Sequence, residues 1–313
     1  MIPAEGTSVP QSADSATGRQ ATRADAARRD AAGRDSTGRD GAGLVFVGEM
    51  YGVQLDHLAA VLGLGEPRAR AIAARWRARR YAESARLGPG GPWTWLTRAG
   101  LAACGLPYAP VPPALARLAH VRAVVAVRLA LESSPRYAAA GGYWRSERRL
   151  RARMGGRVGL REHVPDGEVH WPDDAPVAWA GECWAIEAEL TRKTASRTTA
   201  IMRELLTRTG DYGCPAAEVR VPGRPPRHAR AIYLCAPAAR ATVSRARDAL
   251  GSAGARIEIR SLPPGAAMAP PVRREAPPAR RKGPPARRKG PSARREAPST
   301  GREPPPARRE APP

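Results

Sequence analysis

Large aromatic side chains occupy only one part of this 313-residue chain. All seven Trp, all seven Tyr and the single Phe lie between Phe46 and Tyr233. Such side chains bury enough apolar area to offset the entropy that a chain loses on folding, so a segment without them rarely forms a core. The distribution predicts a folded region over residues 44–262, with a disordered leader (1–43) before it and a disordered tail (263–313) after it.

The two flanking segments differ in charge. In the leader, basic and acidic residues cancel, whereas the tail carries +9 of the chain's net charge of +23. The tail is rich in Pro, and Arg-Arg pairs recur in it every seven residues. Prolines in every repeat forbid a continuous helix, so we expect an extended, partly polyproline-like arm. Such an arm fits either a solubilising tail or a sequence-independent contact with nucleic-acid phosphates.

The remaining charge of +14 lies in the folded region, so that region is basic in its own right. A net positive charge of this size predicts a polyanionic partner. The chain has no run of ~18 apolar residues, which excludes a membrane-spanning helix, and its N-terminus lacks the apolar stretch of a signal peptide. We therefore expect a cytoplasmic protein without a membrane partner.

Two short helices joined by a glycine open the folded region. Leu55, Leu58 and Leu62 have the spacing of an amphipathic helix that Gly63 ends. A second helix begins near residues 66–67 and buries a stripe of small and apolar residues that includes Trp76. Its other faces carry six arginines: Arg68, Arg70, Arg75, Arg77, Arg79 and Arg80. The spacing predicts a helix-turn-helix, and the arginines indicate contact with DNA, the alternative being an ordinary helical domain with solvated arginines.

A hairpin is expected after this helix. The segment beyond Tyr81 can form two short strands around the glycine- and proline-rich residues 88–92, with Trp93 and Trp95 on one face of the second strand. A hairpin that follows a recognition helix is a wing. Residues 44–110 are therefore predicted to form a winged helix-turn-helix.

The second unit, residues 111–262, has a different pattern. It begins with a linker helix at 114–132, in which Leu115 is one of the apolar positions. We expect helices at 143–153, 192–209 and 238–250, and strands at 158–163, 167–171, 176–180, 183–190, 231–235 and 255–259. Strands that alternate with helices late in a unit predict an α/β layer with a mixed sheet, and the chain as a whole is then α+β.

Acidic residues stand out against the positive charge of this unit. Asp166 lies in a predicted turn beside a strand, and Glu187 and Glu189 project from one face of the strand at 183–190. Carboxylates from neighbouring strands are the oxygen ligands that Mg²⁺ requires, and bound Mg²⁺ can activate water against a phosphodiester. Lys193 follows as the only lysine of the folded region, and its compact ammonium suits a phosphate or a metal-bound water.

Together, these residues resemble the PD-(D/E)XK nuclease superfamily. The order of the two units resembles the replication-relaxation family of bacterial plasmids and integrative elements. The resemblance implies Asp166 and Glu187 as metal ligands, Glu147 as the helix acid that orients the site, and Lys193 as the catalytic cation, with Mg²⁺ as the cofactor of an active enzyme. One departure stands out: the superfamily places lysine two residues after the glutamate, where this chain has Glu189. An active nuclease, an inactive DNA-binding scaffold and an exposed polar strand face all remain open.

Other catalytic classes find little support in the sequence. The four cysteines, Cys104, Cys183, Cys214 and Cys235, form no C-x-x-C pair, and no histidine stands at a zinc-ligand spacing, so we expect buried apolar thiols and neither a zinc site nor disulfides. The five histidines show no i, i+4 pairing, and no phosphate-binding G-x-x-x-x-G-K-[ST] loop occurs.

We therefore expect a nucleoid- or plasmid-associated protein of a mobile element that binds double-stranded DNA. It would act in replication, DNA relaxation or transfer, together with other replication or transfer proteins, and its nuclease-like domain would be inactive or weakly active. The alternatives are a Mg²⁺-dependent DNA endonuclease or nickase, and a protein-interaction scaffold or transcriptional regulator.

Overall fold

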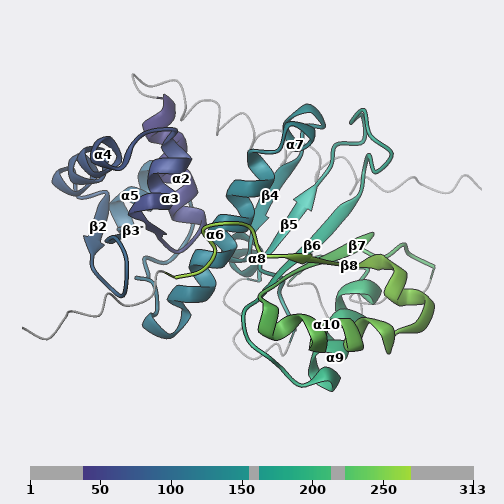
Figure 1. Ribbon diagram of the computed structural model, residues 1–313. Helices are drawn as coiled ribbons and strands as arrows, with labels where there is room; N and C mark the ends of the chain where they lie inside the picture. Colours follow the sequence, from purple (N-terminus) through teal and green to yellow (C-terminus); the bar gives the residue numbers. More distant parts are fainter. Residues whose placement is uncertain (1–37, 155–161, 213–222, 269–313) are drawn as a thin grey trace, which may run out of the picture. The chain divides into compact units, whose positions relative to one another are not determined.

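The computed structural model describes residues 38–154, 162–212 and 223–268 (Figure 1). Most of the predicted leader and tail, Cys214, and most of the strand expected at 158–163 lie outside the described residues. The described part is a mixed α/β structure with two sheets. None of its helices is both long and apolar enough to cross a membrane.

The first part of the fold contains a small antiparallel sheet and four helices. Strand β3 is central and pairs with β1 on one side and β2 on the other. In chain order the elements are α2 (Gly38–Glu49), β1 (Val53–Gln54), α3 (Leu55–Leu62), α4 (Glu66–Ala78), β2 (Ala82–Ala85), β3 (Trp93–Leu96) and α5 (Arg98–Ala103). The predicted helix pair and hairpin are both present.

Local signals set these boundaries. Gly63 ends α3 in the left-handed conformation (φ 62°), and its N–H donates to the carbonyl of Ala60 at 3.0 Å. Pro67 lies in the first turn of α4, where a missing N–H costs nothing. Thr97 caps α5 by accepting a hydrogen bond from the Gly100 N–H at 3.2 Å.

The second part is built on a five-stranded mixed sheet in the order β4-β5-β6-β7-β8. β4, β5 and β6 pair antiparallel, and β6, β7 and β8 pair parallel, which confirms the predicted mixed sheet. Its elements are η1 (Leu115–Arg117), α6 (Leu118–Glu132), α7 (Pro135–Ala139), β4 (Tyr143–Ser146), α8 (Glu147–Arg153), β5 (Gly167–His170), β6 (Cys183–Glu189), α9 (Ala195–Thr207), β7 (Arg230–Cys235), α10 (Pro237–Asp248), η3 (Gly251–Arg256) and β8 (Ile257–Ser261).

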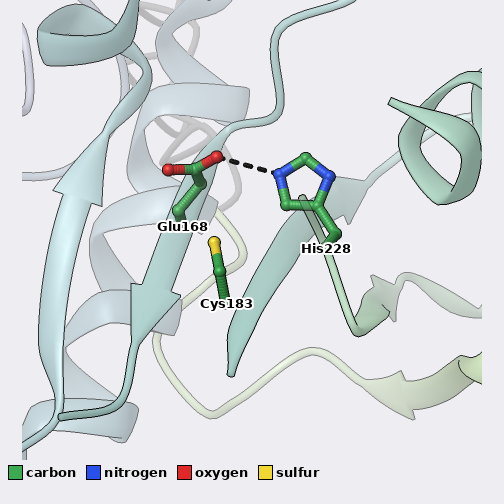
Figure 2. Close-up of side chains that lie close together, drawn as sticks. All are labelled: Glu168, Cys183 and His228. Carbon is green, nitrogen blue, oxygen red and sulfur yellow. Dashed lines mark hydrogen bonds and ion pairs between the residues drawn. The ribbon is translucent and has the colours of Figure 1, made fainter. Parts of the chain in front are cut away.

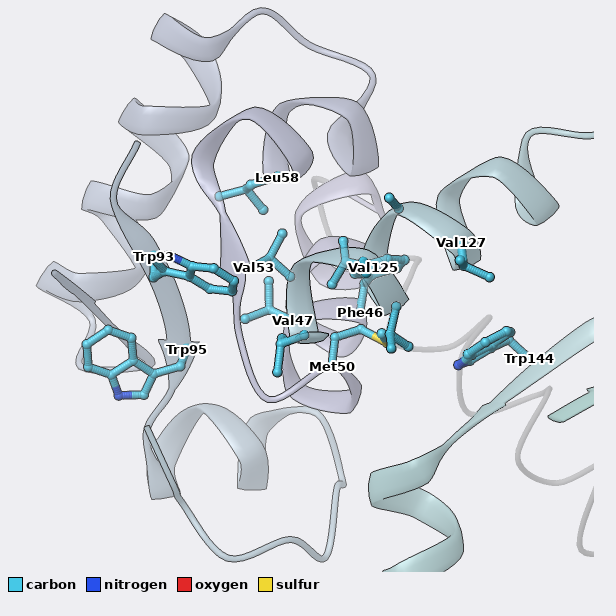
Figure 3. Close-up of a cluster of buried hydrophobic side chains, with 14 of the residues drawn as sticks. Phe46, Val47, Met50, Val53, Leu58, Trp93, Trp95, Val125, Val127 and Trp144 are labelled. Carbon is cyan, nitrogen blue, oxygen red and sulfur yellow. The ribbon is translucent and has the colours of Figure 1, made fainter. Parts of the chain in front are cut away.

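Helices cover both faces of this sheet (Figure 1). Side chains of α6 pack with Trp144, Ile186 and Ala188 in a core that continues into the first part of the fold. Figure 3 shows part of this core, including Phe46, Val125 and Val127 of α6, and Trp144. On the other face, α9 and α10 pack on Ala185, Tyr233 and their neighbours.

Several predicted elements were wrong. The helix expected at 143–153 is strand β4 followed by α8, because residues 143–146 pair with β5 and Ser146 caps the helix by accepting from the Arg149 N–H at 3.2 Å. Residues 176–180 form turns, with Trp179 packed edge-on to Trp171. Leu115, expected on an apolar helix face, is 69% exposed.

The limits of the folded region were also too narrow. Residues 38–43, assigned to the leader, are the first half of helix α2, and Asp40 there bonds Arg75 at 2.6 Å. Residues 263–268, assigned to the tail, pack against the fold: Ala266 is buried, and the Ala267 carbonyl accepts a hydrogen bond from Arg122 at 2.9 Å.

Candidate functional site

The arginines of α4 form a cationic surface. Ala69, Ile72, Ala73 and Trp76 are buried, so the apolar stripe of the helix faces the core. All six predicted DNA-binding residues are exposed: Arg68, Arg70, Arg75, Arg77, Arg79 and Arg80. We call these six residues the arginine surface.

Most of the arginine surface forms no ion pair within the part of the chain that the structure describes. Arg75 pairs with Asp40 at 2.6 Å. The other five make no ion pair with any residue of the described ranges. Arg77, Arg80 and Arg98 line a shallow groove that runs along α4, β2 and the start of α5, with Trp95 in its wall. One carboxylate, Glu83, also lines the groove, so three arginines against one acid give it a net positive charge that suits an extended anion.

The predicted acidic residues lie together on the five-stranded sheet. Asp166 immediately precedes β5, and Glu187 and Glu189 project from one face of β6, as the alternation predicts. Their exposed fractions are 8%, 3% and 3%. The alternative of an exposed strand face is therefore wrong, and the three carboxylates form a buried acidic cluster.

Each of these carboxylates has its own basic partner. Asp166 Oδ1 bonds His120 Nε2 at 2.8 Å, and its Oδ2 accepts from the Ala188 N–H at 2.8 Å. Glu187 Oε1 lies 2.6 Å from His163 Nε2. Lys193 Nζ donates to Glu189 Oε1 at 2.5 Å. Lys193 thus contacts Glu189, the residue at the position where the superfamily has its lysine.

Glu147 contacts this cluster with its backbone N–H and not with its carboxylate. As the first residue of α8, it donates its N–H to the Asp166 carbonyl at 3.2 Å. Its carboxylate pairs instead with Arg151 at 2.8 Å and Arg117 at 3.1 Å. Asp166, Glu147, Arg117 and His120 line a cavity of about 20 Å³, enough for about one water molecule.

Burial and charge shift the proton affinities of this cluster. Burial raises the pKa of Glu187 to about 7, and Asp166 and Glu189 add to the rise, although His163 opposes it. Burial also acts to raise the pKa of Asp166, but His120, the Ala188 N–H and His163 together outweigh it and the pKa is lowered. For His163, burial lowers the pKa but Glu187 outweighs it, so the pKa is raised. The pKa values of both members of the Glu187–His163 pair are therefore raised.

Tyr233 lies beside Glu187 in the acidic cluster. It pairs with Glu187 across β6 and β7, and its hydroxyl is buried without a hydrogen-bond partner among the described residues. Burial, followed by the charges of Glu187 and Glu189, raises the pKa of this phenol well above its ordinary value, so it stays neutral.

The cluster does not form a compact Mg²⁺ site. Carboxylate oxygens are the ligands that Mg²⁺ prefers, but here each carboxylate is already compensated by His120, His163 or Lys193. Within the described ranges, the one group of three metal-ligating side chains whose ligand atoms all lie within 4.8 Å of one another is a different set. Asp166, Glu187 and Glu189 do not form such a group, so their arrangement does not fit a compact Mg²⁺ site.

That other set is Glu168, Cys183 and His228 (Figure 2). Glu168 is fully buried on β5 and accepts bonds from Arg227 at 2.7 and 2.8 Å. His170 joins the same group, with its Nε2 2.8 Å from Glu168 Oε2. Sequence reasoning missed these residues because they lie far apart along the chain, and only the strand register brings them together.

Comparison with protein-family models, with curated proteins and with solved structures found no match.

Proposed function

We propose that this protein binds double-stranded DNA through the arginine surface of α4 and does not cleave it. The observation that carries the proposal is the set of five exposed arginines on one short helix and its end that have no counter-charge among the described residues. Arginine is the residue best suited to phosphates and to guanine edges, because its planar fork donates two parallel hydrogen bonds.

The order of the elements supports a winged helix-turn-helix. Helices α3 and α4 are joined by a tight turn at Gly63, and the β2–β3 hairpin follows directly. An α-helix with its side chains is about 10–12 Å across, which matches the major groove of about 12 Å. With α4 in the groove, the loop between β2 and β3, which carries the exposed Arg86, would lie beside the neighbouring phosphates.

The resemblance to the replication-relaxation family suggests the process. We place the protein in the replication, relaxation or transfer of a plasmid or integrative element, with replication or transfer proteins as further partners. The arginine-rich tail would add sequence-independent contacts with phosphates.

DNA binding can be tested by fluorescence anisotropy with the full chain and a labelled duplex at several salt concentrations. Replacing Arg77 and Arg79 by Ala removes two phosphate contacts, which should reduce the slope of log K against log salt by about 1.8, at about 0.9 per contact. The matched control is Arg203→Ala with Arg245→Ala, two exposed arginines on α9 and α10. Equal losses in the two double variants would remove α4 from the interface. If no duplex bound even at low salt, an acidic protein partner would replace DNA.

Cleavage is tested separately. Supercoiled plasmid is incubated with the protein and Mg²⁺ or Mn²⁺, with Asp166→Asn and Glu187→Gln as matched variants. Because each carboxylate is already paired, we expect no nicking above the level of the variants. Metal-dependent nicking that the two variants abolish would establish a nuclease instead.

A further inference from the structure

The side chains of Glu168, Cys183 and His228 meet in the interior without any sequence motif that links them. Their ligand atoms, a carboxylate oxygen, a thiol sulfur and an imidazole nitrogen, all lie within 4.8 Å of one another. Glu168 and His228 have an exposed fraction of 0%. Figure 2 shows the sulfur and the imidazole pointing toward the same carboxylate.

His170 supplies a fourth donor. Its Nε2 lies 3.5 Å from Cys183 Sγ and 2.8 Å from Glu168 Oε2. In a tetrahedral zinc site with Zn–S of about 2.3 Å and Zn–N of about 2.0 Å, a sulfur and a nitrogen ligand are separated by about 3.5 Å. The ring of His170 is fixed by stacking on Tyr143, with 5.0 Å between the ring centroids and 13° between the planes. His170 Nε2 and Cys183 Sγ thus already have the spacing of two ligands of one zinc ion.

The orientation of the His228 ring suits a ligand. Its Nδ1 lies 3.0 Å from the Leu205 carbonyl, which can only accept, so Nδ1 carries a proton. Nε2 then points at Glu168 Oε1, 2.8 Å away. A backbone carbonyl on one ring nitrogen is the usual device that orients the other nitrogen toward a metal.

We propose that Glu168, Cys183, His170 and His228 form a structural zinc site. Thiolate and imidazole donors select Zn²⁺ over the hard cations Mg²⁺ and Ca²⁺. Four protein ligands, all at least partly buried, leave no open position, which is typical of structural sites. The proposal stands independently of DNA binding.

Arg227 does not block this site. Each oxygen of Glu168 accepts one bond from Arg227 and one from a histidine, so the guanidinium occupies only the outer lone pairs. Zn²⁺ would replace the proton on His228 Nε2 and the proton on the Cys183 thiol, and the proton on His170 Nε2 would move to Nδ1 of the same ring, which leaves His170 neutral. Two positive charges enter and two protons leave, so the buried site keeps its net charge, and Arg227 becomes the outer partner of the ligating carboxylate.

The ion would join three separate parts of the fold. Glu168 and His170 come from β5, Cys183 starts β6, and His228 lies just before β7. Zinc would therefore fix the segment that leads into β7 against the antiparallel half of the sheet. Because metal affinity for a folded site adds to folding free energy, removal of zinc should lower stability.

The test uses the full chain purified without a histidine tag. After dialysis against metal-free buffer, we expect stoichiometric zinc by mass spectrometry. With Co²⁺ in place of zinc, we expect a thiolate-to-cobalt charge-transfer band and the strong visible bands of tetrahedral cobalt. Excess Mg²⁺ should displace neither ion.

Two variants test whether Cys183 supplies the thiolate that gives the charge-transfer band. Cys183→Ala should abolish it and weaken zinc binding by more than about 100-fold, beyond the usual effect of losing an outer partner. Cys235→Ala, on neighbouring β7, is the matched control and should keep it. A band that survives in Cys183→Ala would overturn the proposal. If Cys183→Ala fails to fold, the measurements on the unmodified protein test the proposal. The absence of both stoichiometric zinc and the thiolate-to-cobalt band in that protein would overturn it.

Discussion

The buried ion pair between Glu49 and Arg128 makes a strong prediction about stability. Glu49 ends α2, Arg128 lies on α6, and Arg128 donates from its guanidinium to Glu49 Oε2 at 2.9 Å. The two side chains are only 2% and 8% exposed. The pair therefore joins the first part of the fold to the helix that covers the five-stranded sheet.

The expected magnitude follows from the surroundings of each charge. At an effective dielectric constant of about 20, charges 2.9 Å apart attract by about 6 kcal/mol. Desolvation of several kcal/mol per ion offsets this attraction, so the intact pair contributes little net stability. Removing one partner leaves the other buried charge uncompensated, which costs about 3–5 kcal/mol.

The two single variants should differ. In Arg128→Met, Arg149, at 3.9 Å, is the one cation that Glu49 keeps among the described residues, so we expect the full loss of about 3–5 kcal/mol. In Glu49→Met, Arg128 keeps Glu132 at 2.8 Å and the face of Phe46 at 4.1 Å, so the loss should be about 2 kcal/mol. The double variant should lie within about 1 kcal/mol of the parent, because both charges are gone.

Urea unfolding followed by far-ultraviolet circular dichroism measures all four proteins, and an unchanged m value shows that the same transition is compared. A typical domain has only about 5–15 kcal/mol of stability, so the Arg128→Met loss is readily measured. The reasoning fails if Arg128→Met costs no more than Glu49→Met, or if the double variant costs the sum of the two.

Three further predictions concern the sheet and the tail. Gly167→Ala should cost about 3 kcal/mol in urea unfolding, because the new Cβ would lie 2.0 Å from the buried ring of Trp144, whereas Gly65→Ala, with only one contact at 3.7 Å, should cost far less. Burial raises the pKa of Glu187 from 4.5 to about 7, so its contribution to stability is present below 4.5 and is lost as the pH rises through 7. The unfolding free energy should fall by about 3 kcal/mol over that interval, and Glu187→Gln should remove the fall when unfolding is measured at several pH values. A chain ending at residue 268 should bind all duplexes more weakly and with a flatter salt dependence, measured by anisotropy.

Sequence patterns predicted the elements that local physics determines. The spacing of Leu55, Leu58 and Leu62 and the glycine after them gave α3 correctly, and alternation placed Glu187 and Glu189 on one face of β6. Sequence patterns failed where hydrogen bonding to a neighbouring strand determines the backbone conformation. The helix predicted over residues 143–153 was wrong at 143–146, because these residues pair with β5 and form β4.

The basic partners of the acidic cluster could not be predicted for the same reason. His120 comes from α6 and His163 from the segment before β5, so neither has a fixed spacing from Asp166 or Glu187. The isolated Lys193 was the one signal that composition offered, and the structure pairs it with Glu189. Which carboxylate each cation contacts depends on tertiary packing, which composition does not encode.

Strand register also explains how one face of the five-stranded sheet can hold two separate sets of ionisable side chains. His170 lies opposite Cys183 and Glu168 lies opposite Ala185, so the soft donors gather where β6 begins. Glu187 follows on the same face, two residues beyond Ala185. The two sets have different basic partners: His120, His163 and Lys193 for one, and His170, His228 and Arg227 for the other. Ala185, buried against α9, separates the two sets, so a soft ion at one end leaves the carboxylates at the other end with their own basic partners.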